Sequence, residues 1–314
     1  MHEDEDQTAS QVDENTDTSI PIDEMSDGRR PQFGNRFLKD GDDVYRYNAW
    51  DNVTWDEEQE KKAKETIAKH LQSKISSSEY QDIEQNAGLY WDEFYSTHED
   101  KFYKNRNWLF TEFPELTDNV SRTIFEIGCG VGNTVFPILQ QNPDPNLQVY
   151  CCDFSATAIN ILRQNSLFES RCTAFVCDIT QSDWNEPFEA NSIDVMIMVF
   201  VLSSIPPEKM EFVLKKLYTY LKPGGVILFR DYGRYDLSQL RFKDGKCIAE
   251  NYYVRGEKTL VYFFSLEELC ELFNKCGYEI LDKRVDQRLQ CNRKKKIKMY
   301  RIWIQGKFKK PLTQ

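Results

Sequence analysis

From Thr123 onward the sequence alternates between short apolar runs and amphipathic stretches, and this alternation restricts the fold more than any other feature. The apolar runs cover residues 123–127, 148–152, 172–177, 193–202 and 225–230. Such runs are typical of parallel strands that are buried on both faces. Helical spacing lies between them, at residues 132–141, 155–165 and 207–221. The pattern predicts an α/β fold with an open, doubly wound and mostly parallel sheet.

The chain after residue 230 contains elements that would complete this sheet. Residues 241–263 have the form of an inserted hairpin, and residues 265–276 have helical spacing. Two further apolar stretches, at residues 277–284 and 297–305, have the length and composition of strands. We therefore predict a seven-stranded, Rossmann-like sheet in a domain that covers residues 119–314.

The first 118 residues have a different composition. Residues 1–30 hold ten acidic residues against two arginines and almost no aromatic residues, which predicts a disordered acidic tail. Aromatic residues begin after Pro31, and residues 31–118 form a predicted N-terminal module. A capping box at Thr54–Glu57 predicts a helix to about Leu71. Helical spacing follows at residues 80–95 and 102–113.

A glycine-rich loop connects the first predicted strand to its helix, in the sequence Glu126-Ile127-Gly128-Cys129-Gly130-Val131-Gly132. Glycines let the backbone turn sharply and approach a ligand closely. The second strand ends at Asp153, where a carboxylate can accept hydrogen bonds from both hydroxyls of a ribose. The third strand ends at Asp178, in position to bind an adenine amino group. Together these features predict an adenosine-containing ligand.

The spacing of the loop, G-x-G-x-G, differs from the G-x-G-x-x-G of proteins that bind a pyrophosphate. S-adenosyl-L-methionine has no phosphates, and its methionine part carries an ammonium that suits an acid at Glu126. A nicotinamide-dependent dehydrogenase is the alternative at the level of the fold.

At this point the motifs resemble those of a known family, the eukaryotic tRNA 3-methylcytidine methyltransferases of the seven-strand, methyltransferase-like class. The resemblance covers nearly everything from Pro31 onward. It rests on residues 90–95, 107–114, 126–132, 152–155, 177–178, 200–203 and 229–233. Residues 33–37 and 48–53 look like the N-terminal module of the branch that acts on threonine tRNA. One departure is Phe102-Tyr103-Lys104-Asn105-Arg106, where the family usually has Phe-Phe-Lys-Asp-Arg, so no role is assigned to this stretch.

The resemblance implies an enzyme that forms 3-methylcytidine at position 32 of the anticodon loop, in threonine tRNA and also in serine or arginine tRNA. It implies that Trp91 and Tyr95 close over S-adenosyl-L-methionine and that Gly128 and Gly130 line its methionine end. Asp153 and Asp178 would hold the ribose and the adenine, and Val199 would pack near the adenosine. For Trp91 and Tyr95, simple packing at an i,i+4 helical spacing is the alternative.

Two motifs of other methyltransferases are missing from the sequence. Phe200-Val201-Leu202-Ser203 stands where amino-group methyltransferases have Asn-Pro-Pro-aromatic, and there is no Pro-Cys dipeptide for a covalent adduct. Methylation of a ring nitrogen needs neither. The candidates for stabilising the methylated base are Phe200 and Asp231, with Arg230, Tyr232, Tyr253 and Arg255 around the base or its phosphate. An ion pair between Arg230 and Asp231 is the alternative for those two.

Charge and composition indicate the partners. The net charge is −11, yet residues 283–310 hold twelve basic residues against Asp286 alone, which predicts local binding of a polyanion such as tRNA. A partner such as an aminoacyl-tRNA synthetase or a tRNA-binding subunit is also expected. The nine cysteines form no C-x-x-C pair, which predicts free thiols and no metal site. Without an export signal or an apolar stretch of membrane-spanning length, we expect a cytoplasmic or nuclear protein. A protein or small-molecule methyltransferase, and an inactive RNA-binding subunit, are the alternatives.

Overall fold

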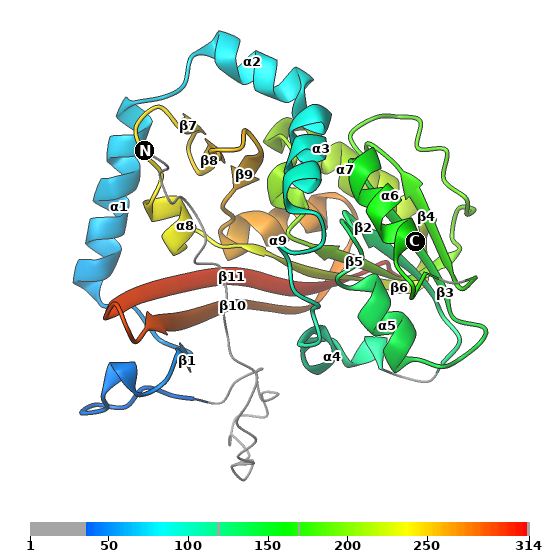
Figure 1. Cartoon of the computed structure of the whole chain (residues 1–314), viewed down its shortest axis with the longest axis horizontal. Helices are drawn as coiled ribbons and strands as arrows, with labels where there is room; N and C mark the ends of the chain where they lie inside the picture. The colour runs from blue at the N-terminus through cyan, green and yellow to red at the C-terminus, as the bar shows by residue number, and fades with distance from the viewer. Residues whose placement is uncertain (1–35, 118–119, 169, 313–314) are drawn as a thin grey trace.

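The computed structural model describes residues 36–117, 120–168 and 170–312 (Figure 1). The predicted acidic tail at residues 1–30, and part of the N-terminal motif at residues 33–37, lie outside these residues. The central sheet has the strand order β1-β10-β11-β6-β5-β2-β3-β4. Its parallel half consists of β2 (Thr123–Ile127), β3 (Gln148–Asp153), β4 (Cys172–Val176), β5 (Ile193–Val199) and β6 (Leu221–Tyr232). The predicted α/β, Rossmann-like fold is confirmed.

The prediction of seven strands is wrong by one. The short strand β1 (Ala49–Asp51) of the N-terminal module pairs antiparallel with β10 (Glu279–Asn292), placing Trp50 opposite Leu289. Three residues are too few to show a strand period in the sequence. Because β1 joins the edge of the sheet, the N-terminal module and the C-terminal strands form one continuous structure.

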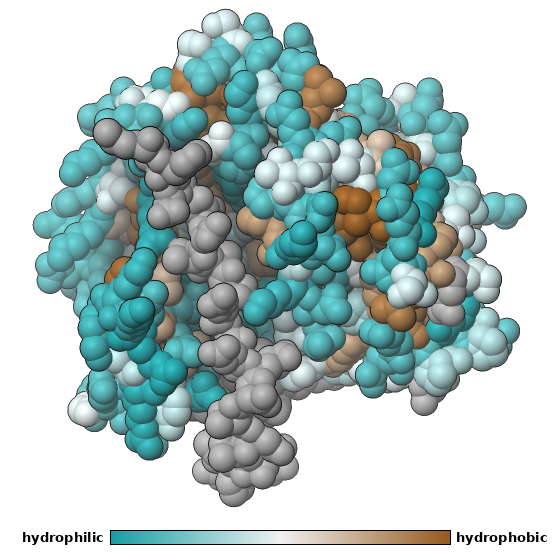
Figure 2. All heavy atoms as spheres, in the orientation of Figure 1, coloured by the Kyte–Doolittle hydropathy of each residue, from teal (hydrophilic) through white to brown (hydrophobic). Residues whose placement is uncertain are grey.

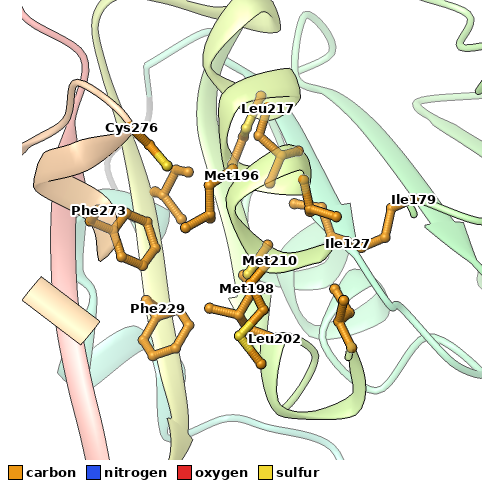
Figure 3. Close-up of a cluster of buried hydrophobic side chains, with 14 of the residues drawn as sticks. Ile127, Ile179, Met196, Met198, Leu202, Met210, Leu217, Phe229, Phe273 and Cys276 are labelled. Carbon is orange, nitrogen blue, oxygen red and sulfur yellow. The ribbon is translucent and has the colours of Figure 1, made fainter. Parts of the chain in front are cut away.

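Helices cover both faces of the sheet. On one face α7 (Pro207–Tyr220) and α9 (Leu266–Lys275) pack against Met196, Met198 and Phe229 (Figure 3). On the other face α5 (Val135–Gln141) and α6 (Ala156–Gln164) pack against the residues that alternate with these. Successive side chains of a strand point to opposite faces, so each buried strand serves two cores. Because β2–β6 run parallel, their carboxyl ends meet at one edge of the sheet.

The helices of the N-terminal module differ from the predicted ones. The first, α1 (Glu57–Gln72), has its capping box at Asp56 and Gln59 rather than at Thr54 and Glu57. Residues 80–95 belong to two helices, α2 (Ser77–Gln85) and α3 (Ala87–His98), which break at Asn86. The third predicted helix is reduced to the single turn α4 (Leu109–Glu112) and the 3-10 turn η2 (Pro114–Leu116).

The loop before α4 is held by the glycine-rich loop instead of forming a helix. The backbone N–H of Arg106 donates to the carbonyl of Asn133 at 2.9 Å, and the Asn133 amide donates to the carbonyl of Tyr103 at 3.1 Å. These tertiary bonds replace the intrahelical bonds that residues 102–108 would otherwise make.

The insertion after β6 is a three-stranded sheet, not a hairpin. Its strands are β7 (Cys247–Ala249), β8 (Tyr252–Val254) and β9 (Leu260–Tyr262), preceded by the short helix α8 (Leu237–Leu240). The 3-10 turn η3 (Leu202–Ser204) lies beside β9.

The last two strands are longer than predicted. β10 and β11 (Ile297–Lys309) pair along their whole length, but β11 pairs with β6 only over Trp303–Lys309. The remaining part extends past β6 as a ribbon (Figure 1), here called the arm: residues 287–302, with a turn at 293–296. Mainly hydrophilic residues cover the end of the molecule that carries α1 and the arm (Figure 2).

Two findings concern the composition. All nine cysteines are buried thiols outside any disulfide bond, as predicted. Within the described ranges no helix has the length and apolar character needed to span a bilayer.

Candidate active site

The glycine-rich loop turns where no side chain would fit. Gly128 and Gly130 have φ angles of 64° and 52°, in the left-handed region that favours glycine. A Cβ added to Gly128 would lie 2.4 Å from Cγ2 of Val201, and one added to Gly130 would lie 2.6 Å from the hydroxyl oxygen of Tyr95. The loop therefore keeps a bare backbone at the carboxyl end of β2, as the sequence predicted.

Asp153 ends β3 beside this loop. Its carboxylate accepts hydrogen bonds from the backbone N–H of Gly130 at 2.8 Å and of Ser155 at 2.9 Å. Burial raises the pKa of Asp153 to about 6, because the surrounding protein solvates the charged form poorly. Asp178 follows β4 and is half-buried, and its carboxylate accepts from the backbone and hydroxyl of Thr180 at 2.9 and 2.7 Å. The two acids thus stand at the ends of neighbouring parallel strands.

Glu126 lies within β2 and is almost fully buried. One carboxylate oxygen is 3.8 Å from the guanidinium of Arg106, and the other, Oε2, has no hydrogen-bond partner among the described residues. Burial raises the pKa of Glu126 to about 8. A buried oxygen without a partner is costly unless a ligand supplies one. The ammonium of a bound methionine group fits this requirement.

Helix α3 places aromatic side chains over the loop. The rings of Trp91 and Tyr95 stack on each other at 6.0 Å, and the hydroxyl of Tyr95 reaches Gly130. Asp92 anchors the helix, because its carboxylate accepts from the Ser155 hydroxyl at 2.5 Å and the Thr157 N–H at 3.0 Å. Trp91 and Tyr95 thus pack on each other at the i,i+4 spacing, and Tyr95 also approaches the glycine loop. A cofactor fits here because the site combines the aromatic side chains of α3, the bare glycine loop and three acids, Glu126, Asp153 and Asp178.

At the end of β5, Val199 is buried and Phe200 has the unusual φ angle of 61°. This conformation costs a non-glycine residue about 1–3 kcal/mol and is found mainly where the surroundings impose it. The Phe200 N–H donates to the carbonyl of Arg230 at 2.8 Å, and its ring lies 4.8 Å from that of Tyr232. The Phe200 ring also lies 5.9 Å from the guanidinium of Arg106.

The ion pair considered between Arg230 and Asp231 does not exist. As neighbours on β6, the two side chains point to opposite faces of the sheet. Arg230 pairs with Asp286 at 2.5 Å. Asp231 is fully buried and accepts from the backbone N–H of Ser203 at 2.9 Å and of Tyr232 at 2.8 Å. Burial raises the pKa of Asp231 to about 6.

The position predicted for Tyr253 is also wrong. Its side chain is fully buried within the inserted sheet, where its ring stacks on Phe242 at 4.6 Å and its hydroxyl lies 3.3 Å from Nδ1 of His70. All three residues of β8 are buried, so Tyr253 does not reach the surface of the site. Arg255 follows the strand, and its guanidinium lies 5.3 Å from the centre of the Tyr232 ring.

Arg106 is a residue of the site to which the sequence assigned no role. Its guanidinium donates to the Thr134 hydroxyl at 3.3 Å, pairs with Glu126 and lies 5.9 Å from the Phe200 ring. It therefore connects the cofactor side of the site with the aromatic side. The motif at residues 102–106 could have pointed to Arg106. We assigned it no role because the motif departs from the family pattern.

Binding of S-adenosylhomocysteine at pH 7 should release roughly one proton, because Glu126 with a pKa of about 8 is mostly protonated in the free protein and a bound ammonium favours its ionised form. Calorimetry in two buffers with different ionisation enthalpies measures this release. Glu126→Gln should bind more weakly and remove the buffer dependence. Equal enthalpies for the wild-type protein in both buffers would contradict the role given to Glu126.

Comparisons with known proteins support the fold. A model of the methyltransferase domain family matches residues 125–227. A solved S-adenosylmethionine-dependent methyltransferase from Anabaena variabilis superposes with a TM-score of 0.52 at 16% identity, covering 72% of this chain and 95% of that chain. At this identity the likeness supports the fold alone. Together with the bare loop and the acids around it, the domain match makes S-adenosylmethionine the cofactor.

Curated relatives extend over most of the chain. The tRNA N(3)-methylcytidine methyltransferase Mettl2 of Drosophila melanogaster is 52% identical over 89% of this chain and 88% of its own length. The tRNA N(3)-cytidine methyltransferase METTL2 of Mus musculus is 44% identical over 93% of this chain and 92% of its own length. The tRNA N(3)-methylcytidine methyltransferase trm140 of Schizosaccharomyces pombe is 43% identical over 88% and 92%. The chain therefore belongs to the family of tRNA N(3)-cytidine methyltransferases.

Proposed function

We propose that this protein transfers a methyl group from S-adenosylmethionine to N3 of cytosine 32 in the anticodon loop of threonine tRNA, with serine and arginine tRNAs as further substrates. The methylation of a tRNA cytidine at N3 follows from the family. The choice of position 32 and of threonine tRNA follows from the likeness of residues 33–37 and 48–53 to one branch. The observation that carries the proposal is the aromatic and cationic cluster of Phe200, Tyr232, Arg106 and Arg255 beside the glycine loop.

The chemistry suits a site without a general base. The bound cofactor supplies an electrophilic methyl group on a sulfonium. N3 of cytosine has a lone pair in the plane of the ring, so it needs no prior deprotonation, and the residues have mainly to orient the base and exclude water. The ring gains a positive charge as the methyl group arrives. We assign the compensating carboxylate to Asp231, which is buried and accepts the backbone N–H groups of Ser203 and Tyr232. The faces of the Phe200 and Tyr232 rings favour a cationic ring as well.

The base must be exposed before its N3 can react. Single-stranded loops offer bases that can be turned outward and stacked on aromatic side chains. Phe200 and Tyr232 are the stacking residues that we assign to the target cytosine. Arg255, which faces Tyr232 from the inserted sheet, is assigned to the phosphate of the turned-out nucleotide.

The arm and the N-terminal module provide a second contact surface for the tRNA. Tyr47 lies under two guanidiniums, those of Arg36 at 4.9 Å and Arg46 at 5.3 Å. Tyr45 lies 4.5 Å from Nζ of Lys296 at the turn of the arm. Exposed cations beside aromatic rings are a common combination in surfaces that bind nucleic acids. By contrast Lys307, counted with the basic segment in the sequence, is buried and paired with Glu115, so it belongs to the core.

Neutralising Arg293, Lys294, Lys295 and Lys296 together should weaken tRNA binding and flatten its salt dependence. Each phosphate contact that is lost should lower the slope of log affinity against log salt by a little under one unit, as for duplex nucleic acid. Titrations of labelled threonine tRNA at several salt concentrations measure the slope. Neutralising Lys215 and Lys275 on the α7–α9 surface is the control, and S-adenosylhomocysteine affinity should not change in either variant. An unchanged slope would show that the turn of the arm is only a solvated surface.

A methyl-transfer assay on total tRNA and on total protein distinguishes the proposal from a protein or small-molecule methyltransferase. Label should enter tRNA alone, and label in protein would sink the proposal. We further propose that the enzyme works in the cytoplasm or the nucleus with a partner, such as an aminoacyl-tRNA synthetase or a tRNA-binding subunit. If the purified protein is inactive, cell extract should restore the label.

A further inference from the structure

A layer of buried charged residues separates α4 from the arm and β6. The face of the sheet here carries Arg230 of β6, Gln305 of β11, and Asp286 and Arg288 of β10, which lie beside one another because the strands are in register. Glu112 of α4 closes the layer, since its carboxylate accepts from the Gln305 amide at 3.1 Å. A buried charge that loses its partner is costly, so the charges of this layer hold the strands and α4 in one arrangement.

Arg230 is the most confined member of this layer. Its side chain is 5% exposed and lies between two indole rings, Trp108 at 5.0 Å and Trp303 at 4.9 Å. The guanidinium donates to Asp286 at 2.5 Å and to Gln305 at 2.6 Å. Burial alone would raise the pKa of Asp286, but the guanidiniums of Arg230 and Arg288 hold it below its usual value. The side chain of Arg230 is thereby committed to the layer and is not directed at a bound base.

The backbone of Arg230, in contrast, belongs to the active site. Its carbonyl accepts the N–H of Phe200, the residue in the left-handed conformation. A strained residue stays in place only if its surroundings are firmly held. The anchored side chain of Arg230 supplies this hold on β6, one residue before Asp231 and two before Tyr232.

The same layer continues into the N-terminal module. Arg288 pairs with Asp286 at 3.0 Å and with Asp51 of β1 at 3.4 Å. Asp51 in turn accepts the backbone N–H of Arg36 at 3.1 Å, beside the aromatic and cationic surface around Tyr47. A continuous set of ion pairs and hydrogen bonds thus joins β6 to the surface around Tyr47 that we propose for tRNA.

We infer that Arg230 is a positioning residue whose buried ion pair with Asp286 holds Phe200 in the geometry required for methyl transfer and ties that geometry to the arm. The inference rests on the proposed function. Arg230 acts through its backbone contact with Phe200, not by touching the substrate. Removing the ion pair should therefore impair the chemical step more than the binding of either ligand.

The experiment compares Arg230→Met, Arg230→Lys and Asp286→Asn with the wild-type enzyme on threonine tRNA. For Arg230→Met, kcat should fall roughly 10- to 100-fold, the scale expected when reacting groups are misplaced by about 1 Å. KM for tRNA and the affinity for S-adenosylhomocysteine should stay within about threefold of wild type. Arg230→Lys keeps a cation between the two indoles and should recover most of the lost kcat. Lys222→Met, which breaks the ion pair with Asp194 at the other end of β6, is the matched control and should leave kcat unchanged.

A double-mutant cycle is a second test, because it measures the coupling between Arg230 and Asp286. If the pair acts as a unit, Arg230→Met and Asp286→Asn combined should lower kcat little more than Arg230→Met alone. Three outcomes would overturn the inference: an unchanged kcat in Arg230→Met, strictly additive effects in the cycle, or an equal loss in Lys222→Met. Should Arg230→Met not fold, Arg230→Lys and Asp286→Asn carry the test. Absence of methyl transfer by the wild-type enzyme, both alone and with cell extract, would instead refute the proposed function.

Discussion

Asp153→Ala is expected to abolish binding of S-adenosylhomocysteine, and with it methyl transfer. The carboxylate stands at the end of β3 beside the bare backbone of Gly130, where two ribose hydroxyls can donate to it. Each such charged hydrogen bond contributes roughly 1.5–3 kcal/mol, so the two together correspond to a loss of more than about a hundredfold in affinity. Calorimetry measures the affinity directly. Because burial raises the pKa of Asp153 to about 6, the wild-type affinity should also decline as the pH falls below that value.

Two further variants separate binding from folding in this test. Asp153 also accepts the backbone N–H groups of Gly130 and Ser155, so the alanine variant removes part of the support of the loop. Asp153→Asn keeps the shape of the side chain and one acceptor oxygen, and should fold while binding weakly. Asp144→Ala, which changes a half-buried acid in the loop before β3, is the control and should bind normally. An affinity of Asp153→Ala within a few-fold of wild type would show that the ribose is held elsewhere.

The parallel half of the fold could be predicted because its strands are nearly continuous apolar runs, a pattern that local sequence preserves. The elements that were missed depend on distant partners. β1 exists because three residues pair with β10 across more than two hundred positions of sequence. Residues 102–108 lack a helix because Arg106 and Tyr103 bond to Asn133, the residue that follows the glycine loop. Such contacts override local helical spacing and leave no periodic signal.

The site residues that lie at strand ends could likewise be predicted, and those that depend on distant partners could not. Gly128, Gly130, Asp153 and Asp178 were located from their places at strand ends, because the carboxyl ends of parallel strands gather at one edge. The role of Arg230 could not be inferred from the sequence, because its partner Asp286 is brought near it only by the pairing of β6, β11 and β10.

Threonine tRNA with uracil in place of cytosine 32 should accept no methyl group. N3 of uracil carries a proton and offers no lone pair, whereas cytosine presents one at the same place in the same loop. The rest of the tRNA is unchanged, so the arm should bind both molecules equally well. A titration of each tRNA provides this control, and the Asp153→Ala enzyme gives the background of the assay.

Nucleoside mass spectrometry of the methylated tRNA identifies both the modified nucleoside and its position. Purified protein, or protein with cell extract, is incubated with threonine tRNA and labelled S-adenosylmethionine, and the digested tRNA is examined for labelled 3-methylcytidine. We predict labelled 3-methylcytidine from the oligonucleotide that contains position 32, and none from the uracil-32 tRNA or from the Asp153→Ala enzyme. Label that survives the change of base, or that appears in another nucleoside, would contradict the account.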